Sequence, residues 1–91
     1  MDLGQPDSYL DLKAGTAVYS SDEHLLGKVE RVRAAVDLDI FDGIVIDRGH
    51  RSGGHRYVDA AQVREIFERG VALSISAEEA DRLPEPDGDT R

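Results

Sequence analysis

The chain has 91 residues, of which 40% are hydrophobic and 33% charged, a globular rather than a disordered composition. Its 19 acidic and 11 basic residues give a net charge of −8, and this negative field disfavours generic nucleic-acid binding. The absence of cysteine excludes disulfides and thiol chemistry, and no run of about 18 apolar residues is present to span a membrane. One small acidic domain in the cytoplasm is therefore expected.

Three segments differ in composition. Residues 1–8 are predicted to form a flexible arm, and they are neither basic nor apolar enough for a secretory signal. Residues 85–91 are predicted to form a polar acidic tail, because Pro84 and Pro86 cannot continue a helix. The folded domain is thus expected over residues 9–84.

Short β-segments separated by turn residues dominate the folded domain. In the second segment Val32, Ala34 and Val36 share one face while Val29 falls out of phase, which predicts a β-bulge near Glu30 and Arg31. Such bulges bend strands, and small barrels need bent strands to close. In chain order, the clearest strands are predicted over residues 16–19, 27–36, 40–47, 55–59 and 71–76.

Residues 59–70 carry a local helix signal. Asp59 is a suitable N-cap, Gln62 completes a capping box, and Gly70 is a suitable terminator. A turn followed by a strand is the alternative over the same residues.

A short C-terminal helix is indicated after the last strand. Ser76 and Glu79 form a capping box, and Pro84 ends the helix after about two turns. Elsewhere, glycines are predicted at turns or bends of the backbone, and they are Gly15, Gly27, Gly43 and Gly70.

No constellation of catalytic or metal-binding residues is indicated. His24, His50 and His55 are expected in turns or at strand edges and lack a familiar metal-ligand spacing. No serine lies in a G-x-S-x-G turn, and no glycine pattern matches a phosphate-binding loop. We therefore expect neither an enzyme, nor a metal, a cofactor or a small-molecule substrate.

The segment Arg48–Arg56 stands out in this acidic chain. Its three glycines predict a flexible hairpin connection between two strands. One interpretation is a contact with an anion or a partner, because arginine offers a bidentate fork to carboxylate or phosphate. The alternative is a solvated loop whose arginines pair with the chain's own acids, Asp47 and Asp59 among them. The candidate contact residues are Arg48, His50, Arg51, His55 and Arg56.

Short motifs follow one another in a characteristic order across the folded domain. They are Gly15, Val18 and Asp22, then Leu-Gly-Lys-Val at 26–29, Phe-Asp-Gly-Ile-Val-Ile at 41–46, Arg-Tyr-Val-Asp-Ala at 56–60, Val63, Gly-Val-Ala-Leu at 70–73 and Leu83-Pro84. In order and spacing this set resembles a PRC-barrel domain, the β-barrel module shared by the photosynthetic reaction-centre H subunit and a bacterial ribosome-maturation factor. The resemblance covers residues 15–84.

The resemblance implies a mostly-β fold, a small barrel of five to six short antiparallel strands with one short C-terminal helix. It also implies a turn over Asp59–Gln62 and a strand over Val63–Phe67, against the local helix signal. The sequence departs from the family at Asp22-Glu23-His24, where the family usually has Asp-Gly, so a longer or differently shaped turn is expected. It departs again at Asp59, where the family often has proline.

The resemblance further implies a non-catalytic protein-interaction or assembly module, because the barrel serves assembly in that family. Its partner would be a second copy in a homodimer or a larger complex, and exposed strand edges suit such pairing. The alternative is a ribosome- or RNA-associated module that contacts anions through the Arg48–Arg56 loop, although the net charge makes nucleic acid an unfavourable partner. A small-ligand carrier is disfavoured, because side chains should fill so small a barrel.

Overall fold

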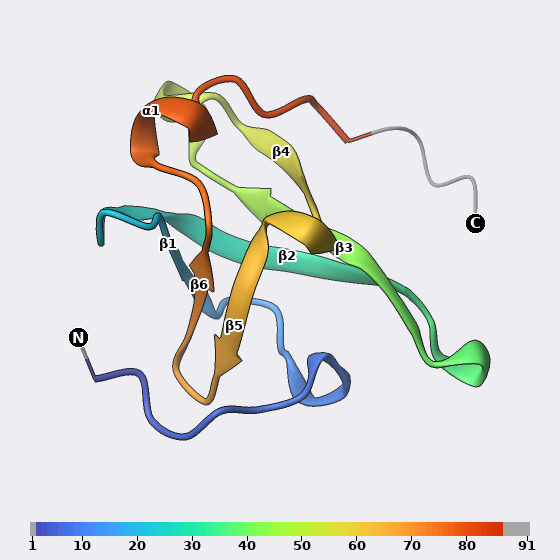
Figure 1. The fold of residues 1–91 in the computed structure, drawn as a ribbon. Coiled ribbons are helices and arrows are strands. Elements are labelled where there is room, and N and C mark those ends of the chain that lie inside the picture. The colour runs from blue at the N-terminus through green and yellow to red at the C-terminus, as the bar shows by residue number, and fades with distance from the viewer. Residues whose placement is uncertain (1, 87–91) are drawn as a thin grey trace.

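The computed structural model describes residues 2–86. Within these residues, six strands and one short helix follow in chain order (Figure 1). Three of the connecting turns are 3-10 helical, and a fourth 3-10 turn precedes the first strand. The mostly-β prediction with one C-terminal helix is confirmed. The elements are β1 (Ala17–Tyr19), β2 (Leu25–Ala35), β3 (Ile40–Asp47), β4 (His55–Asp59), β5 (Val63–Phe67), β6 (Gly70–Leu73) and α1 (Ala77–Ala80).

All six strands belong to one sheet, in the order β4-β3-β2-β1-β6-β5. The prediction of purely antiparallel strands is wrong for one pair, because β1 runs parallel to β6 with Val18 opposite Val71. Tight hairpins force neighbouring strands to run antiparallel. The chain between β1 and β6 instead passes through four other strands, so no hairpin turn fixes the relative direction of this pair.

One hydrophobic core serves the whole sheet. It takes side chains from every strand, from Val58 on β4 to Ile66 on β5, and is completed by Ala80 and Leu83 at the C-terminal end. Because the four residues of α1 cannot cover a six-stranded sheet, the sheet buries its inner face by curling around this core. The sheet is thus curled but not closed into the predicted barrel, because its end strands β4 and β5 are not paired with each other within residues 2–86.

Strand β2 bends where the sequence predicts a bulge. The register between β2 and β3 shifts between Val29 and Arg31, which confirms the bulge at Glu30. The extra residue brings Val29, only 2% exposed, and Val32 to the same side of the sheet although they are three residues apart. A second shift, between Arg33 and Ala34, leaves Asp42 unmatched in the register, so the extra residue there lies on β3.

Two of the predicted glycines stand where backbones approach too closely for a side chain. A Cβ atom at Gly27 would lie 2.8 Å from the carbonyl carbon of Asp47, and still closer to its oxygen. A Cβ atom at Gly43 would collide with the carbonyl oxygen of Val58 on the neighbouring strand. Of the other two, Gly15 lies just before β1 and Gly70 opens β6.

The segment with conflicting signals forms a turn and a strand. Asp59 and Gln62 make the predicted capping box, but the box caps only the 3-10 turn Ala60–Gln62, after which the chain continues directly into β5. Ile66 of β5 pairs opposite Val71 and is only 8% exposed. Pairing and burial thus override the local helix preference. At α1 the capping box of Ser76 and Glu79 is confirmed, although the helix is shorter than predicted.

Residues 2–8, predicted as a flexible arm, instead lie along β5. The main-chain N–H of Asp7 donates to the carbonyl of Ile66 at 2.8 Å, and Leu3 is only 9% exposed. The open edge of an end strand presents unsatisfied N–H and C=O groups, and the arm satisfies part of them. The other end strand is covered similarly, because Tyr57 of β4 donates its N–H to the carbonyl of Pro84. The predicted acidic tail is described only at residues 85 and 86.

The turn between β1 and β2 is tied to the start of α1 by Asp22. This turn spans Ser20–His24, longer than a two-residue hairpin turn, and Glu23 adopts a left-handed conformation with φ of 64°. The carboxylate of Asp22 accepts hydrogen bonds from the Ser20 hydroxyl and, at 3.0 Å, from the N–H of Ala77. These bonds, above all that from Ser20, hold the pKa of Asp22 below its ordinary value.

Gly27→Ala should lower the free energy of unfolding by at least about 2 kcal/mol, because the added methyl group must displace backbone atoms of Asp47. Gly54→Ala is the matched control: its φ is +68°, but no other atom lies within 4 Å of the added methyl group. This variant should lower the free energy of unfolding by only about 1 kcal/mol, because alanine is strained in a left-handed backbone conformation. Urea titration of both variants checks this order, and an equal or smaller loss at Gly27 would contradict it.

Asp22→Asn should remove a pH-dependent part of the stability. A carboxylate whose pKa is lowered on folding stabilises the protein above its unfolded pKa, near 3.8, and loses that effect as pH falls through the folded pKa. The stability difference between wild type and variant should therefore shrink as pH falls from about 5 to about 2. Thermal unfolding at several pH values measures it, and a constant difference would show that the pKa of Asp22 does not change on folding.

Candidate interaction surface

Residues 48–54 form the connection between β3 and β4, and His55 and Arg56 begin β4. The connection contains the 3-10 turn His50–Ser52, and the N–H of Arg48 donates to the carbonyl of Gly54 at 2.8 Å to close it. Gly53 and Gly54 both have positive φ, which allows the chain to reverse in so few residues. The sequence therefore placed this charged segment correctly at one end of the β3–β4 hairpin.

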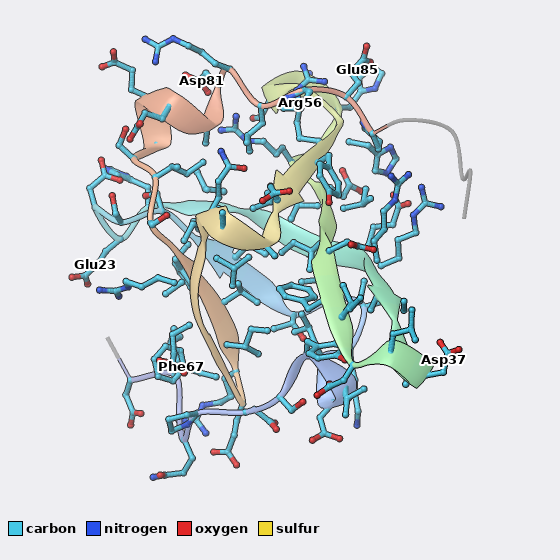
Figure 2. All side chains as sticks on the ribbon, turned by 45° about the vertical axis from the view of Figure 1, so that its right-hand side comes forward. Glu23, Asp37, Arg56, Phe67, Asp81 and Glu85 are labelled. Carbon is cyan, nitrogen blue, oxygen red and sulfur yellow. The ribbon has the colours of Figure 1, made fainter. Side chains whose placement is uncertain are left out.

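Two of its arginines pair with acids of the same chain. The guanidinium of Arg48 lies 2.9 Å from the carboxylate of Asp81, and its side chain is only 11% exposed. Arg56 reaches Glu85 at 3.8 Å (Figure 2). Both pairs connect this hairpin to the C-terminal segment. These pairs offset much of the positive charge that an anion would need.

The side chain of His55 lies between a carboxylate on β2 and a carboxylate on β3. Its Nε2 contacts the carboxylate of Glu30 on β2 and lies 3.8 Å from that of Asp47 on β3. Of the predicted contact residues, only His50 and Arg51 are exposed and make no ion pair within the described part of the chain. Pairing with acids of the same chain, one of the two interpretations of this segment, is thus found for Arg48 and Arg56 and not for Arg51 within residues 2–86, and the partners are Asp81 and Glu85 instead of Asp47 and Asp59.

A different surface carries exposed apolar side chains. Val36, Leu38 and Ile40 stand at the turn between β2 and β3, and Leu10 lies in the 3-10 turn Tyr9–Asp11 beside it. They are 57% (Leu10), 63% (Val36), 67% (Leu38) and 47% (Ile40) exposed. We call these four residues the hairpin surface.

The hairpin that carries this surface projects from the body of the molecule. Figure 1 shows the turn between β2 and β3 reaching beyond the other strands, and Figure 2 shows Asp37 at its outer end. The Tyr9 ring stacks on Phe41 with centroids 5.2 Å apart, and its hydroxyl donates to Asp39 at 2.9 Å. These contacts fix Leu10 beside the hairpin, while burial and then Asp39 raise the pKa of Tyr9.

An apolar groove runs along the base of the hairpin surface. Its volume is about 200 Å³, between the Tyr9–Asp11 turn and the end of β2. It is open to solvent and continuous with the exposed Leu10 and Val36. The lining side chains are Tyr9, Leu10, Leu12, Val32, Ala34 and Val36.

Sequence reasoning missed this surface. It placed Val36 on the strand face shared by Val32 and Ala34, but Val36 begins the 3-10 turn Val36–Leu38 and points into solvent. The available signal was the alternation Val-Asp-Leu-Asp-Ile over residues 36–40, which puts three aliphatic side chains beside the acids of a turn.

No group of three or more potential ligands within residues 2–86 is placed to bind a metal ion. In the same part of the chain, no helix has the length and apolar character needed to cross a bilayer. Neither a protein-family model nor a curated protein matches the chain. The interpretation of the hairpin surface therefore depends on its physical properties.

Arg48→Ala should lower the free energy of unfolding by about 1 to 2 kcal/mol, through loss of the Asp81 pair and of the packing of its aliphatic stem. Arg51→Ala is the matched control, and its exposed side chain should change stability by less than about 0.5 kcal/mol. Chemical denaturation compares the two. Equal losses would mean that the Arg48 pair does not stabilise the fold.

Proposed function

We propose that the chain is a non-catalytic protein-interaction module of the PRC-barrel type, which self-associates or docks onto a larger cytoplasmic assembly through the hairpin surface. The observation that supports the proposal is the exposure of Val36, Leu38 and Ile40 on a projecting hairpin, with the exposed Leu10 in the turn beside it. Burial of apolar surface against a partner is favourable by about 25 cal/mol per Å² of area removed from water. Contiguous apolar patches on small proteins commonly mark interaction sites.

The hairpin surface is also a better candidate than the charged loop. An anion-binding function needs unpaired positive charge, and the pairs of Arg48 with Asp81 and Arg56 with Glu85 reduce it. For contact with an anion the loop retains the exposed His50 and Arg51, in a chain of net charge −8. Contact with a protein through apolar side chains is less sensitive to that net charge, because burial of apolar area does not depend on the sign of the surrounding field.

A photo-crosslinking amino acid at position 38 tests the proposal in living cells. Leu38 should give discrete covalent adducts, because it lies on the hairpin surface. Leu25 is the matched control: it is the same residue type, 65% against 67% exposed, and lies at the opposite end of β2. Position 25 should give few adducts. Absence of discrete adducts from position 38, or the same adducts from both positions, would overturn the proposed function.

A further inference from the structure

One edge of β2 has no partner strand over its second half. Strand β3 pairs with β2 along most of its length, whereas β1 pairs with it only as far as Lys28. The next residue, Val29, is bonded to Gly15 and Thr16. Beyond Val29, no main-chain hydrogen bond from another segment reaches this edge within residues 2–86. We call residues 31–35 of β2 the open edge.

Two residues of the open edge direct their main-chain groups away from β3. Tyr57 donates its N–H away from β3, so in the alternating antiparallel ladder its partner Val45 directs its N–H and C=O toward β2. Arg31 lies opposite Val45, so its own groups point toward β3. The residues that follow alternate, and the groups of Val32 and Ala34 therefore point to the open side. The second irregularity between the two strands lies on β3 and does not change the alternation along β2.

One face of the open edge is apolar. The side chains of Val32 and Ala34 line the groove of about 200 Å³, whose other side is formed by the Tyr9–Asp11 turn and Leu12. A strand added at this edge would direct every second side chain into the groove, because directly opposite residues of paired strands share a face. Unpaired main-chain groups beside an apolar groove are the features by which an extended segment is added to a sheet. The groove therefore suits aliphatic side chains at alternate positions of the added segment.

The opposite face of the open edge carries two arginines. Val45 is fully buried but lies outside the core cluster that both of its chain neighbours join, so it is on the outer face of β3. Arg31 lies opposite Val45 and is therefore on the outer face as well. Arg33 follows two residues later on the same face, and its guanidinium lies 5.4 Å from the centre of the Tyr57 ring. The groove and the arginines thus belong to opposite faces of the same short stretch of β2.

Arg31 has no acidic partner within the described residues. It forms no ion pair there, and its Nε, although shielded from solvent, has no hydrogen-bond acceptor. A shielded N–H without an acceptor is unfavourable compared with one that is bonded. A carboxylate directly opposite Arg31 on an added strand would supply the acceptor, and a guanidinium can bind both carboxylate oxygens. The positive charge of Arg33 favours a second acid two residues along the same segment.

We propose that the open edge binds an extended segment of a partner protein in which aliphatic residues alternate with aspartate or glutamate. The aliphatic side chains enter the groove, and the acids lie opposite Arg31 and Arg33. This inference rests on the proposed function and specifies its partner, because the groove continues into the hairpin surface at Val36. Salt screens the repulsion from the net charge of −8 beyond about 8 Å, whereas the arginines act on the acids at direct contact.

Selection from a displayed library of random peptides, with the wild-type protein as bait, tests the partner class. Each peptide is about seven residues long, enough for one short strand. Enriched sequences should alternate aliphatic and acidic residues, and fluorescence anisotropy then gives the dissociation constant of one such peptide. Replacement of its acids by lysine should raise that constant at least about tenfold. Enrichment of basic or uncharged sequences, or of none, would overturn the proposal.

Arg31→Glu should raise the dissociation constant of the selected peptide on the order of tenfold, because like charges then face each other. Arg64→Glu is the matched control, with the same change in net charge at an exposed position on β5, and should stay within about twofold of wild type. The lysine-containing peptide should bind Arg31→Glu more tightly than it binds wild type, because the attraction is restored with the signs exchanged. Equal effects of the two substitutions would contradict the contact with Arg31.

Circular dichroism verifies that each variant is folded. If Arg31→Glu is not folded, the comparison of the acidic and the lysine-containing peptide on wild type decides whether charge selects the segment. Equal binding of both peptides would then overturn the proposal.

Amide hydrogen exchange tests whether the segment pairs through its main chain. In the free protein the N–H groups of Arg31 and Arg33 should be protected, because they point toward β3. Those of Val32 and Ala34 should exchange faster, and the bound peptide should slow their exchange at least about tenfold. Unchanged exchange at both residues would overturn the addition of a strand.

These outcomes are distinct from failure of the proposed function. A selection without alternating sequences, while position 38 still crosslinks in cells, would remove the acidic segment and leave the interaction module intact. Absence of position-38 adducts would remove both. Sedimentation velocity of the wild type tests the other occupant of the edge. A dimer in which Val32 and Ala34 are protected without peptide would show that a second copy covers the edge, and would overturn the partner segment.

Discussion

The close approach of backbones at Gly27 and Gly43 is the constraint on which the curled sheet depends. At both positions a single methyl group would meet main-chain atoms of a nearby segment. Together with the bulge at Glu30, these contacts let β2, β3 and β4 bend enough for one inner face to surround a core. Without that curvature, a chain with one four-residue helix has nothing else to cover the aliphatic side chains of its strands.

Because no hydrogen bonds join the end strands of the curled sheet within residues 2–86, strand edges remain, and they are covered to different extents. Residues 2–8 cover part of the β5 edge, and Pro84 accepts the N–H of Tyr57 on the β4 edge. Prolines near both edges also suit this task, because they cannot donate to a further strand. The second half of β2 receives no such cover within the described residues, and it is also where the apolar groove lies.

Features set by neighbouring residues could be predicted from the sequence. The bulge at Glu30, the capping boxes and the strand over Ile40–Asp47 all follow from patterns a few residues long. Features that depend on distant segments could not: the parallel direction of β1 and β6, the docking of residues 2–8, and the identity of Asp81 as the partner of Arg48. Val36 shows the same limit at the candidate site, because its alternation with Val32 indicates a face of a strand but not whether anything covers it.

The parallel contact between β1 and β6 also has a consequence for the order in which the molecule forms. Strands β2, β3 and β4 are linked by short connections and can pair as soon as they are synthesised, whereas β1 gains its second neighbour only when almost the whole chain is present. Pairing across such a sequence separation requires closure of a large loop, which slows folding. The β1–β6 pair is thus among the last to be completed during synthesis, although it lies inside the finished sheet and not at its edge.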